Sequence, residues 1–427
     1  MEFKFNDQLS LGVASAATQI EGGACEHSWN DWYERGKIKD HSNPARATDH
    51  YKRWKEDAAL MTSMKIEHYR MGIEWARICP QEGEVDGAAV AHYREELEYL
   101  KEEGITVLLT IHHFTNPMWF ERKGAFTKRE NIKYFLDFVK LIINEFASLV
   151  SEYITINEPN VYATNSYYFG EWPPGEKSIS KTMRVMSNIA ICHIKAYQMI
   201  HRMRESMGYQ DSKVSFANHL RNFDPKNPGN PWHCICARLL DRFFQGALTE
   251  AISTGDFKWP LKRPKDIVHG EYLDFIAINY YTRSSVSGFG DGVREAAPKN
   301  DLGWEIYPKG LIRCVGDTYQ LLKRPIYITE NGTCDNQDTF RSKYIYEHLK
   351  EISASKLPIA RYYHWCYCDN FEWVEGESAR FGLVHVNYET QERTIKASGR
   401  FYTKMIEERG VSEEVYREYV EPQEYHN

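Results

Sequence analysis

The fold is indicated by the segment Tyr153-Ile154-Thr155-Ile156-Asn157-Glu158-Pro159, in which a predicted buried strand ends directly at a charged residue. Its first four residues are mostly β-branched or apolar, which is typical of a strand covered on both faces. Pro159 then breaks the strand, so Glu158 stands where strand passes into loop. The segment Ile326-Tyr327-Ile328-Thr329-Glu330-Asn331-Gly332 repeats the arrangement, with Gly332 as the breaker. In a barrel of parallel strands, catalytic side chains occupy this edge.

Strand-like runs recur along the chain and alternate with amphipathic stretches. Eight runs are predicted as strands, namely Leu9–Ala14, Ile66–Ile73, Thr106–Ile111, Tyr153–Ile156, Lys213–Ala217, Leu273–Ile278, Ile326–Thr329 and Arg361–His364. Helical periodicity marks intervening stretches such as Ala91–Glu103, Asn131–Phe146 and Met183–Met203. This alternation predicts parallel strands joined by crossover helices. Eight such units predict one closed (β/α)8 barrel, a TIM barrel, with residues 1–427 forming a single catalytic domain.

An open doubly wound sheet is the alternative architecture. It would require a glycine-rich phosphate-binding turn after an early strand, and the sequence that follows Leu11-Gly12-Val13-Ala14 lacks that pattern. Polar or aromatic residues instead lie in the end of, or just after, every predicted strand: Gln19, Glu21, Arg70, Trp75, His112, His113, Asn157, Glu158, Asn218, His219, Asn279, Tyr280, Tyr281, Glu330 and Trp365. Such regularity favours the barrel.

Composition narrows the class of protein. The net charge of −7 argues against a general binder of nucleic acid or of membrane surfaces. The nine cysteines are odd in number and irregularly spaced, which favours free thiols over disulfides or a metal site. The segment Met1–Asp7 has no apolar signal region and no stretch approaches a membrane span. We therefore expect a cytoplasmic protein; the sequence does not indicate its oligomeric state.

Enzymes that hydrolyse a glycosidic bond usually use two carboxylates that face one cleft. One protonates the leaving oxygen and the other meets the developing positive centre, so their surroundings should differ. Asn157 offers an amide for the sugar 2-hydroxyl, and Arg70 near Glu330 would keep that carboxylate ionised. The alternatives are solvated surface glutamates and a structural ion pair for Arg70.

Histidines 112 and 113 could instead be metal ligands. Neighbouring residues of a strand point to opposite faces, so the pair cannot easily share one ion. We expect His113 to face inward and donate a hydrogen bond to a sugar hydroxyl. Trp365, at a strand end, is expected under a sugar ring, with a plain core residue as the alternative.

The chain resembles glycoside hydrolase family 1, the retaining β-glucosidase and β-galactosidase family, over about residues 5 to 405. The matching motifs occur in the family's order: Gln19-Ile20-Glu21-Gly22, Tyr69–Arg77, Thr110-Ile111-His112-His113, Thr155-Ile156-Asn157-Glu158-Pro159, Ile278-Asn279-Tyr280-Tyr281, Gly303–Pro308, Ile328-Thr329-Glu330-Asn331-Gly332, Asp369-Asn370-Phe371-Glu372-Trp373 and Arg380-Phe381-Gly382-Leu383. One such motif would be weak evidence for the family, whereas the whole series in the family's order is specific to it.

The resemblance implies a role for each matching position. Glu158 would be the general acid/base and Glu330 the nucleophile. The residues expected to bind the non-reducing sugar are Gln19, His113, Asn157, Tyr281, Trp365, Glu372 and Trp373, with Arg70 and Asn279 in support. Three positions depart from the pattern: Phe114 replaces a tryptophan whose N–H often reaches the 3-hydroxyl, Cys366 replaces a serine, and Glu377 stands where tyrosine is common.

The expected activity is that of a retaining, exo-acting β-glycosidase on a small, unphosphorylated β-glycoside, most of all a β-D-glucoside, without metal or organic cofactor. A 6-phospho-β-glycosidase is one alternative, but that branch replaces the Glu372-Trp373 pair and carries a lysine that is absent from Ala379-Arg380-Phe381. A catalytically inactive sugar-binding barrel is the other, but it would have lost a catalytic glutamate.

Overall fold

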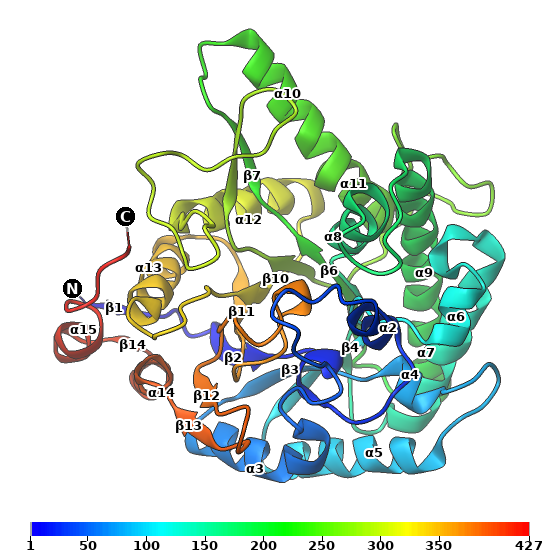
Figure 1. The fold of residues 1–427 in the computed structure, drawn as a ribbon, viewed down its shortest axis with the longest axis horizontal. Coiled ribbons are helices and arrows are strands. Elements are labelled where there is room, and N and C mark those ends of the chain that lie inside the picture. Colours follow the sequence, from blue (N-terminus) through cyan, green and yellow to red (C-terminus); the bar gives the residue numbers. More distant parts are fainter. Residues whose placement is uncertain (1, 427) are drawn as a thin grey trace.

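The computed structural model describes residues 2–426, and its central strands close into an eight-stranded barrel surrounded by helices (Figure 1). All neighbouring strands of the barrel pair in parallel. In barrel order they are β2 (Ser10–Ala14), β3 (His68–Gly72), β4 (Thr106–His112), β5 (Glu152–Asn157), β6 (Lys213–His219), β8 (Ile276–Asn279), β10 (Ile326–Asn331) and β11 (Ile359–Trp365). The predicted (β/α)8 fold is confirmed, and each predicted strand overlaps one barrel strand.

Helices separate the barrel strands along the chain (Figure 1). They are α1 (Ala17–Ile20), α2 (Ser28–Glu34), α3 (His50–Ser63), α4 (Trp75–Ile78), α5 (Gly87–Glu102), α6 (Met118–Arg122), α7 (Ile132–Phe146), α8 (Pro159–Thr164), α9 (Ile179–Ser206), α10 (Pro231–Asp241), α11 (Ala247–Thr254), α12 (Pro308–Leu322), α13 (Arg341–Ala354), α14 (Ala397–Glu408) and α15 (Glu413–Tyr419). Short 3-10 turns lie at Ala125–Thr127, Arg129–Asn131 and Trp373–Glu375, and π-helical turns at Asn165–Phe169 and Arg242–Gly246.

Helix α7 illustrates how the sequence builds the outer layer. Phe135, Phe138, Val139, Ile142 and Phe146 recur at helical spacing and are all buried. Its predicted bounds were correct to one residue. Helices α5 and α9 begin four residues before their predicted starts, because side chains cap them: Asp86 accepts from Ala88 N and Ala89 N, and Ser178 accepts from Lys181 N.

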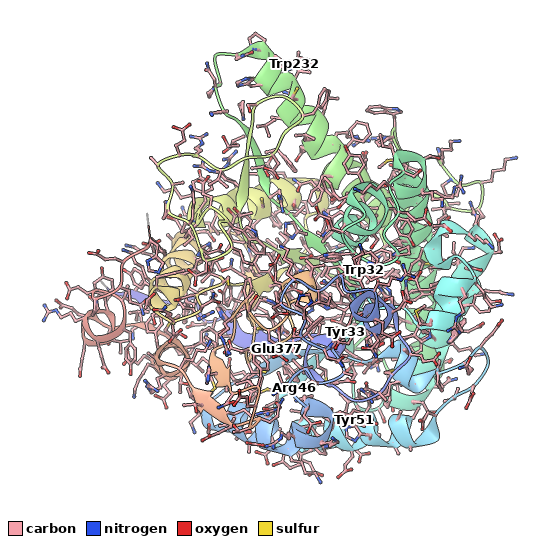
Figure 2. The ribbon with its side chains drawn as sticks, in the orientation of Figure 1. Trp32, Tyr33, Arg46, Tyr51, Trp232 and Glu377 are labelled. Carbon is pink, nitrogen blue, oxygen red and sulfur yellow. The ribbon has the colours of Figure 1, made fainter. Side chains whose placement is uncertain are left out.

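Three small sheets lie outside the barrel and were not predicted. Strand β1 (Phe3–Lys4) pairs with β14 (Gly410–Val411), β12 (Val384–Val386) with β13 (Arg393–Ile395), and β7 (Asn222–Pro225) with β9 (Arg283–Val286). Helix α10 packs on β7 and projects from the barrel at the top of Figure 1. Trp232 lies near its outer end (Figure 2) with 51% of its surface exposed.

All nine cysteines are free thiols, as the sequence predicted. Within residues 2–426, none of the helices combines the length and the apolar character needed to cross a membrane.

Candidate active site

The carboxyl ends of the barrel strands surround a pocket of about 290 Å³. Glu158, directly after β5, and Glu330, in β10, both line it, and both side chains are buried. The same pocket is lined by five more of the predicted residues, namely His113, Tyr281, Trp365, Glu372 and Trp373. Gln19, Arg70, Asn157 and Asn279 lie just behind these, in contact with them. The structure thus brings all the predicted site residues together.

Glu330 is held by a cation and a phenol. Arg70 Nη1 donates to Oε1 at 2.5 Å, and the Tyr281 hydroxyl donates to Oε2 at 2.5 Å. Burial raises the pKa of Glu330 to about 7, against the lowering effect of Arg70, while the Glu158 carboxyl raises it further. Both donors favour the ionised carboxylate, which is the form that can attack a carbon atom.

Glu158 lies in a backbone conformation that is rare for glutamate. Its φ of 38° is in the left-handed region, and Pro159 follows at the first position of α8. The pairing register of β5 shifts between Ile154 and Asn157, just before this residue. Such irregularities turn side chains at strand ends toward a site. The Glu158 carboxyl accepts from Asn279 Nδ2 at 2.9 Å and contacts His219 Nδ1 at 3.1 Å.

Asn157 links the two glutamates to His113. Its Oδ1 accepts from Arg70 Nη2 at 2.6 Å and from Asn279 Nδ2 at 3.0 Å, which fixes the amide orientation. Its Nδ2 therefore donates to His113 Nε2, at 2.9 Å. Burial, reinforced by Arg70, lowers the pKa of His113 well below its usual range, so the ring is neutral with its proton on Nδ1. That buried Nδ1–H has no partner within residues 2–426 and is a ready donor for a ligand hydroxyl.

Gln19 and Glu372 form the second polar pair of the pocket. Gln19 Nε2 donates to Glu372 Oε2 at 3.1 Å and to Phe371 O at 2.9 Å, which leaves Gln19 Oε1 buried without a partner in the described chain. Burial raises the pKa of Glu372 to about 8, although a hydrogen bond from Gln19 lowers it. At neutral pH this carboxyl is mostly protonated, so it can donate as well as accept. The pair thus offers both donors and acceptors to a ligand.

Aromatic rings form the wall around His113. The rings of Trp365 and Trp373 each lie 5.8 Å from the His113 ring, at interplanar angles of 29° and 26°. Phe114, in place of the family's tryptophan, packs edge-on against Trp172 at 4.7 Å and Trp373 at 5.3 Å. It presents only carbon to the pocket that it lines. No indole donor is available at this position.

The other two departures lie away from the pocket surface. The Cys366 thiol is buried, donates to Cys368 O at 3.0 Å and accepts from Asn370 Nδ2 at 3.1 Å. Glu377 (Figure 2) is not among the residues that line the pocket; its backbone N–H donates to Asp40 Oδ2 at 2.7 Å. Neither replacement introduces a new group into the pocket.

Sequence reasoning missed several residues that line the pocket. His219, Arg221 and Phe244 line it together with Phe169 and Trp172. The sequence indicates His219 only as a residue that ends a strand. Phe244 lies in the π-helical turn Arg242–Gly246, far from any predicted strand end. The polar run Asn218-His219 with Arg221 two residues later was the available signal.

The two adjacent histidines separate as predicted. His112 faces away from His113 and contacts Asn116 Oδ1 through Nε2 at 2.9 Å. Across residues 2–426, no three His, Cys, Asp or Glu side chains are grouped so that they could hold a metal ion. Absence of a cofactor remains a prediction.

The raised pKa of Glu372 predicts how stability depends on pH. The folded carboxyl stays protonated up to about pH 8, whereas the unfolded chain ionises it above its ordinary value of 4.5. Between these values the unfolded state binds fewer protons, so this group lowers stability as pH rises. Glu372→Gln should therefore exceed the wild type in unfolding free energy at pH 9 by on the order of 1–3 kcal/mol, and match it at pH 5.

Urea unfolding at both pH values measures this difference. Glu389→Gln, at an exposed site between β12 and β13, is the matched control and should leave the pH dependence as it is. Equal pH dependence in Glu372→Gln and the wild type would refute the assigned shift.

Known proteins similar to this chain in sequence and fold include β-glucosidases and a β-glycosidase. The model of glycosyl hydrolase family 1 matches residues 1–411. Beta-glucosidase A of Thermotoga maritima is 29% identical over 449 residues, covering 96% of this chain and 99% of its own. A beta-glycosidase from Pyrococcus horikoshii superposes with a TM-score of 0.89 at 30% identity, covering 98% of both chains. The Thermotoga maritima beta-glucosidase in complex with glucoimidazole gives 0.88 at 28% identity, covering 96% of this chain and all of its own.

The match spans the barrel and every motif around the pocket. The chain therefore belongs to glycosyl hydrolase family 1 and is a glycoside hydrolase of the β-glycosidase type.

Proposed function

We propose that this protein is a retaining, exo-acting β-glucosidase that hydrolyses small unphosphorylated β-D-glucosides, with residues 1–427 acting as one catalytic domain. The observation that carries the proposal is the pair of buried glutamates at the ends of β5 and β10, which face one pocket but have different partners. Glu330 contacts Arg70 and Tyr281, whereas Glu158 contacts Asn279 and His219. The different surroundings of the two carboxyl groups fit the different roles of proton donor and nucleophile.

The reaction proceeds in two displacements. Glu330 attacks the anomeric carbon while Glu158 gives its proton to the leaving oxygen, so the glycosidic C–O bond breaks and a glycosyl ester forms. Glu158, now a carboxylate, takes a proton from water, whose oxygen attacks the same carbon and releases Glu330. Two inversions leave the sugar with its original β configuration. This mechanism requires the two carboxyl groups about 5–5.5 Å apart.

The polar end of the pocket supports both exo action and the choice of sugar. Gln19 and Glu372 lie side by side there, and a bound ring would end against them. Their mixed donor and acceptor atoms suit a 4-hydroxyl in either orientation, so we expect β-galactosides and β-fucosides as secondary substrates. Within the described part of the chain, His113 Nδ1–H and Gln19 Oε1 are buried without a partner, and sugar hydroxyls would satisfy both.

The proposed reaction needs no cofactor, and we also propose its partner and its cellular location. No metal or organic cofactor takes part, because the two carboxyls supply both the proton and the nucleophile. The substrate is the only partner we assign, and we assign no role with nucleic acid or membranes. The nine free thiols suit a reducing compartment, which supports a cytoplasmic location.

A 6-phospho-β-glycosidase is the alternative to be excluded. A phosphate dianion on the sugar 6-position would meet the Glu372 carboxyl, which supplies no positive charge to balance it. Arg380, in the segment where the phospho-branch carries its lysine, is engaged with Asp369 Oδ2 at 2.8 Å. This arrangement favours an uncharged sugar.

A panel of aryl glycosides tests the proposal. 4-Nitrophenyl β-D-glucoside should be cleaved, the galactoside and fucoside less well, and the 6-phosphoglucoside at least about 100-fold more slowly in kcat/KM, equal to roughly 2.7 kcal/mol of lost transition-state binding. Faster cleavage of the phosphorylated substrate would overturn the assignment. No turnover of any β-glycoside would favour the inactive barrel.

A further inference from the structure

The two oxygens of the Glu158 carboxyl have unequal surroundings. Asn279 Nδ2, at 2.9 Å, and His219 Nδ1, at 3.1 Å, both meet Oε1. Across residues 2–426, no group forms a hydrogen bond to Oε2, and the side chain lines the catalytic pocket. An oxygen that accepts two hydrogen bonds is a poor site for the acidic proton. The proton of the acid form therefore belongs on Oε2.

The contact from His219 acts in this way only if its Nδ1 carries a hydrogen. Arg221 Nη2 lies 3.2 Å from the other ring nitrogen, Nε2. A guanidinium has donors and no acceptor, so Nε2 must accept this bond. The ring hydrogen then lies on Nδ1 and is directed at Glu158. Arg221 thereby fixes the tautomer, as second partners do for functional histidines.

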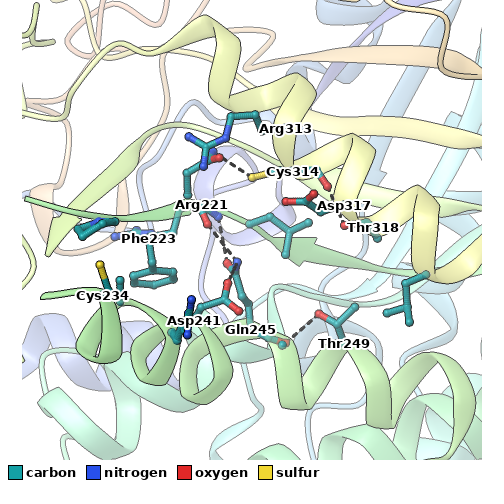
Figure 3. A pocket seen from close by; sticks show the side chains of 17 residues that line it. Arg221, Phe223, Cys234, Asp241, Gln245, Thr249, Arg313, Cys314, Asp317 and Thr318 are labelled. Atoms are coloured by element: carbon teal, nitrogen blue, oxygen red, sulfur yellow. Dashed lines mark hydrogen bonds between the residues drawn. The ribbon is translucent and has the colours of Figure 1, made fainter. Parts of the chain in front are cut away.

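Arg221 is itself firmly held. The Gln245 side chain clamps its backbone, accepting from Arg221 N at 3.0 Å and donating to Arg221 O at 3.0 Å (Figure 3). Its Nη1 donates to Asp291 Oδ2 at 2.9 Å. Arg221 also lines a second pocket, of about 580 Å³, besides the catalytic one. The guanidinium therefore has a defined position from which to orient His219.

The His219 ring is fixed on its flanks as well. It stacks on Tyr281 at 5.9 Å, with an interplanar angle of 19°, and the Phe244 ring meets it edge-on at 5.8 Å. The backbone carbonyl of His219 accepts from Asn160 Nδ2 at 2.8 Å. Only 7% of the His219 surface is exposed, so the ring cannot turn freely.

We propose that His219, with its tautomer set by Arg221, is a positioning residue that holds Oε1 of Glu158 so that Oε2 delivers the proton to the leaving oxygen. In the first displacement the Oε2 proton passes to the leaving oxygen as the C–O bond breaks. In the second, Oε2 takes a proton from the attacking water. His219 keeps its own proton throughout. The inference rests on the proposed role of Glu158 as the acid/base.

A series of aryl β-glucosides, from dinitrophenyl to phenyl, tests this role in the full-length enzyme. His219→Leu removes the donor and should lower kcat/KM for phenyl glucoside about tenfold to a hundredfold. For dinitrophenyl glucoside, whose leaving group needs little protonation, kcat/KM should stay within about threefold. The dependence of rate on leaving group should therefore become steeper. His219→Asn carries an amide nitrogen near the position of Nδ1 and should recover part of the loss.

The pH profile gives a second readout. Loss of one donor to a carboxylate favours its protonated form, so the basic limb of kcat/KM should move to higher pH in His219→Leu. The charged or titratable groups around His219 and Glu158 are Arg221 after β6, Tyr281 after β8, Asp291 after β9, Glu330 on β10, Arg70 on β3 and Glu372 after β11. All remain in the variant. Arg221→Met should likewise make kcat/KM depend more steeply on the leaving group and move its basic limb to higher pH.

Arg313→Met is the matched control. Arg313 lines the second pocket and pairs with Asp224 Oδ1 at 2.9 Å, but it does not line the catalytic pocket (Figure 3). It should leave the leaving-group dependence and the basic limb unchanged. An equal loss for every leaving group in folded His219→Leu, with an unmoved basic limb, would overturn the proposal. If Glu158→Ala also fails to steepen the dependence, the acid/base assignment itself is wrong.

Discussion

Replacing Glu330 by glutamine should lower kcat/KM for phenyl β-D-glucoside by at least about 10⁴-fold, because no glycosyl ester can form without the carboxylate. Glutamine keeps the volume of the side chain, so the packing around it is retained. Glu330→Ala should be equally inactive. It also leaves the fully buried Arg70 without its ion partner, which we expect to cost about 3–5 kcal/mol of stability.

Initial rates should be measured well below the melting temperature of each variant, with circular dichroism to verify folding. A folded Glu330→Gln enzyme that keeps more than about 1% of wild-type kcat/KM would exclude Glu330 as the nucleophile, since general acid–base catalysis alone contributes about 10²–10⁴-fold.

Replacing Glu158 by alanine should have an effect that depends on the substrate. For phenyl glucoside, which needs a proton on its leaving oxygen, kcat/KM should fall about 10²–10⁴-fold. For dinitrophenyl glucoside the first displacement should still occur, after which the enzyme stalls as a glycosyl ester for lack of a base. A burst of dinitrophenol followed by slow turnover is the expected result.

The burst is measured by stopped-flow absorbance at enzyme concentrations comparable with substrate. Glu121→Ala is a suitable comparison, because it replaces a half-buried glutamate that does not line the catalytic pocket. A uniform loss across leaving groups in Glu158→Ala, without a burst, would contradict the assignment of the proton donor.

The barrel and the centre of its site were predictable because local signals are strong there. Runs such as Tyr153–Ile156 are apolar and end abruptly at Pro159 or Gly332, so strand and site edge are both visible in the sequence. The motifs around Gln19, His113, Glu330 and Glu372 resemble one family in series, which gave their roles as expectations.

The missing parts depend on contacts between distant segments. Arg221 and Gln245 come together only through the small sheet of β7 and β9 and the π-helical turn that carries Phe244. No periodicity marks a two-stranded parallel pair of four-residue strands. The tautomer of His219 likewise follows from Arg221 in space, and the sequence alone cannot reveal it.

The anomer formed when azide rescues each variant tests the central claim most directly. Azide needs no base, so with dinitrophenyl glucoside it should release the stalled Glu158→Ala ester as the β-glucosyl azide, after two inversions. In Glu330→Ala, azide should attack directly from the vacated face and give the α-azide, after one inversion. Proton NMR of the two products distinguishes these anomers. β-Azide from Glu158→Ala and α-azide from Glu330→Ala are the predicted results, whereas an α-product from Glu158→Ala would show that the two roles are reversed.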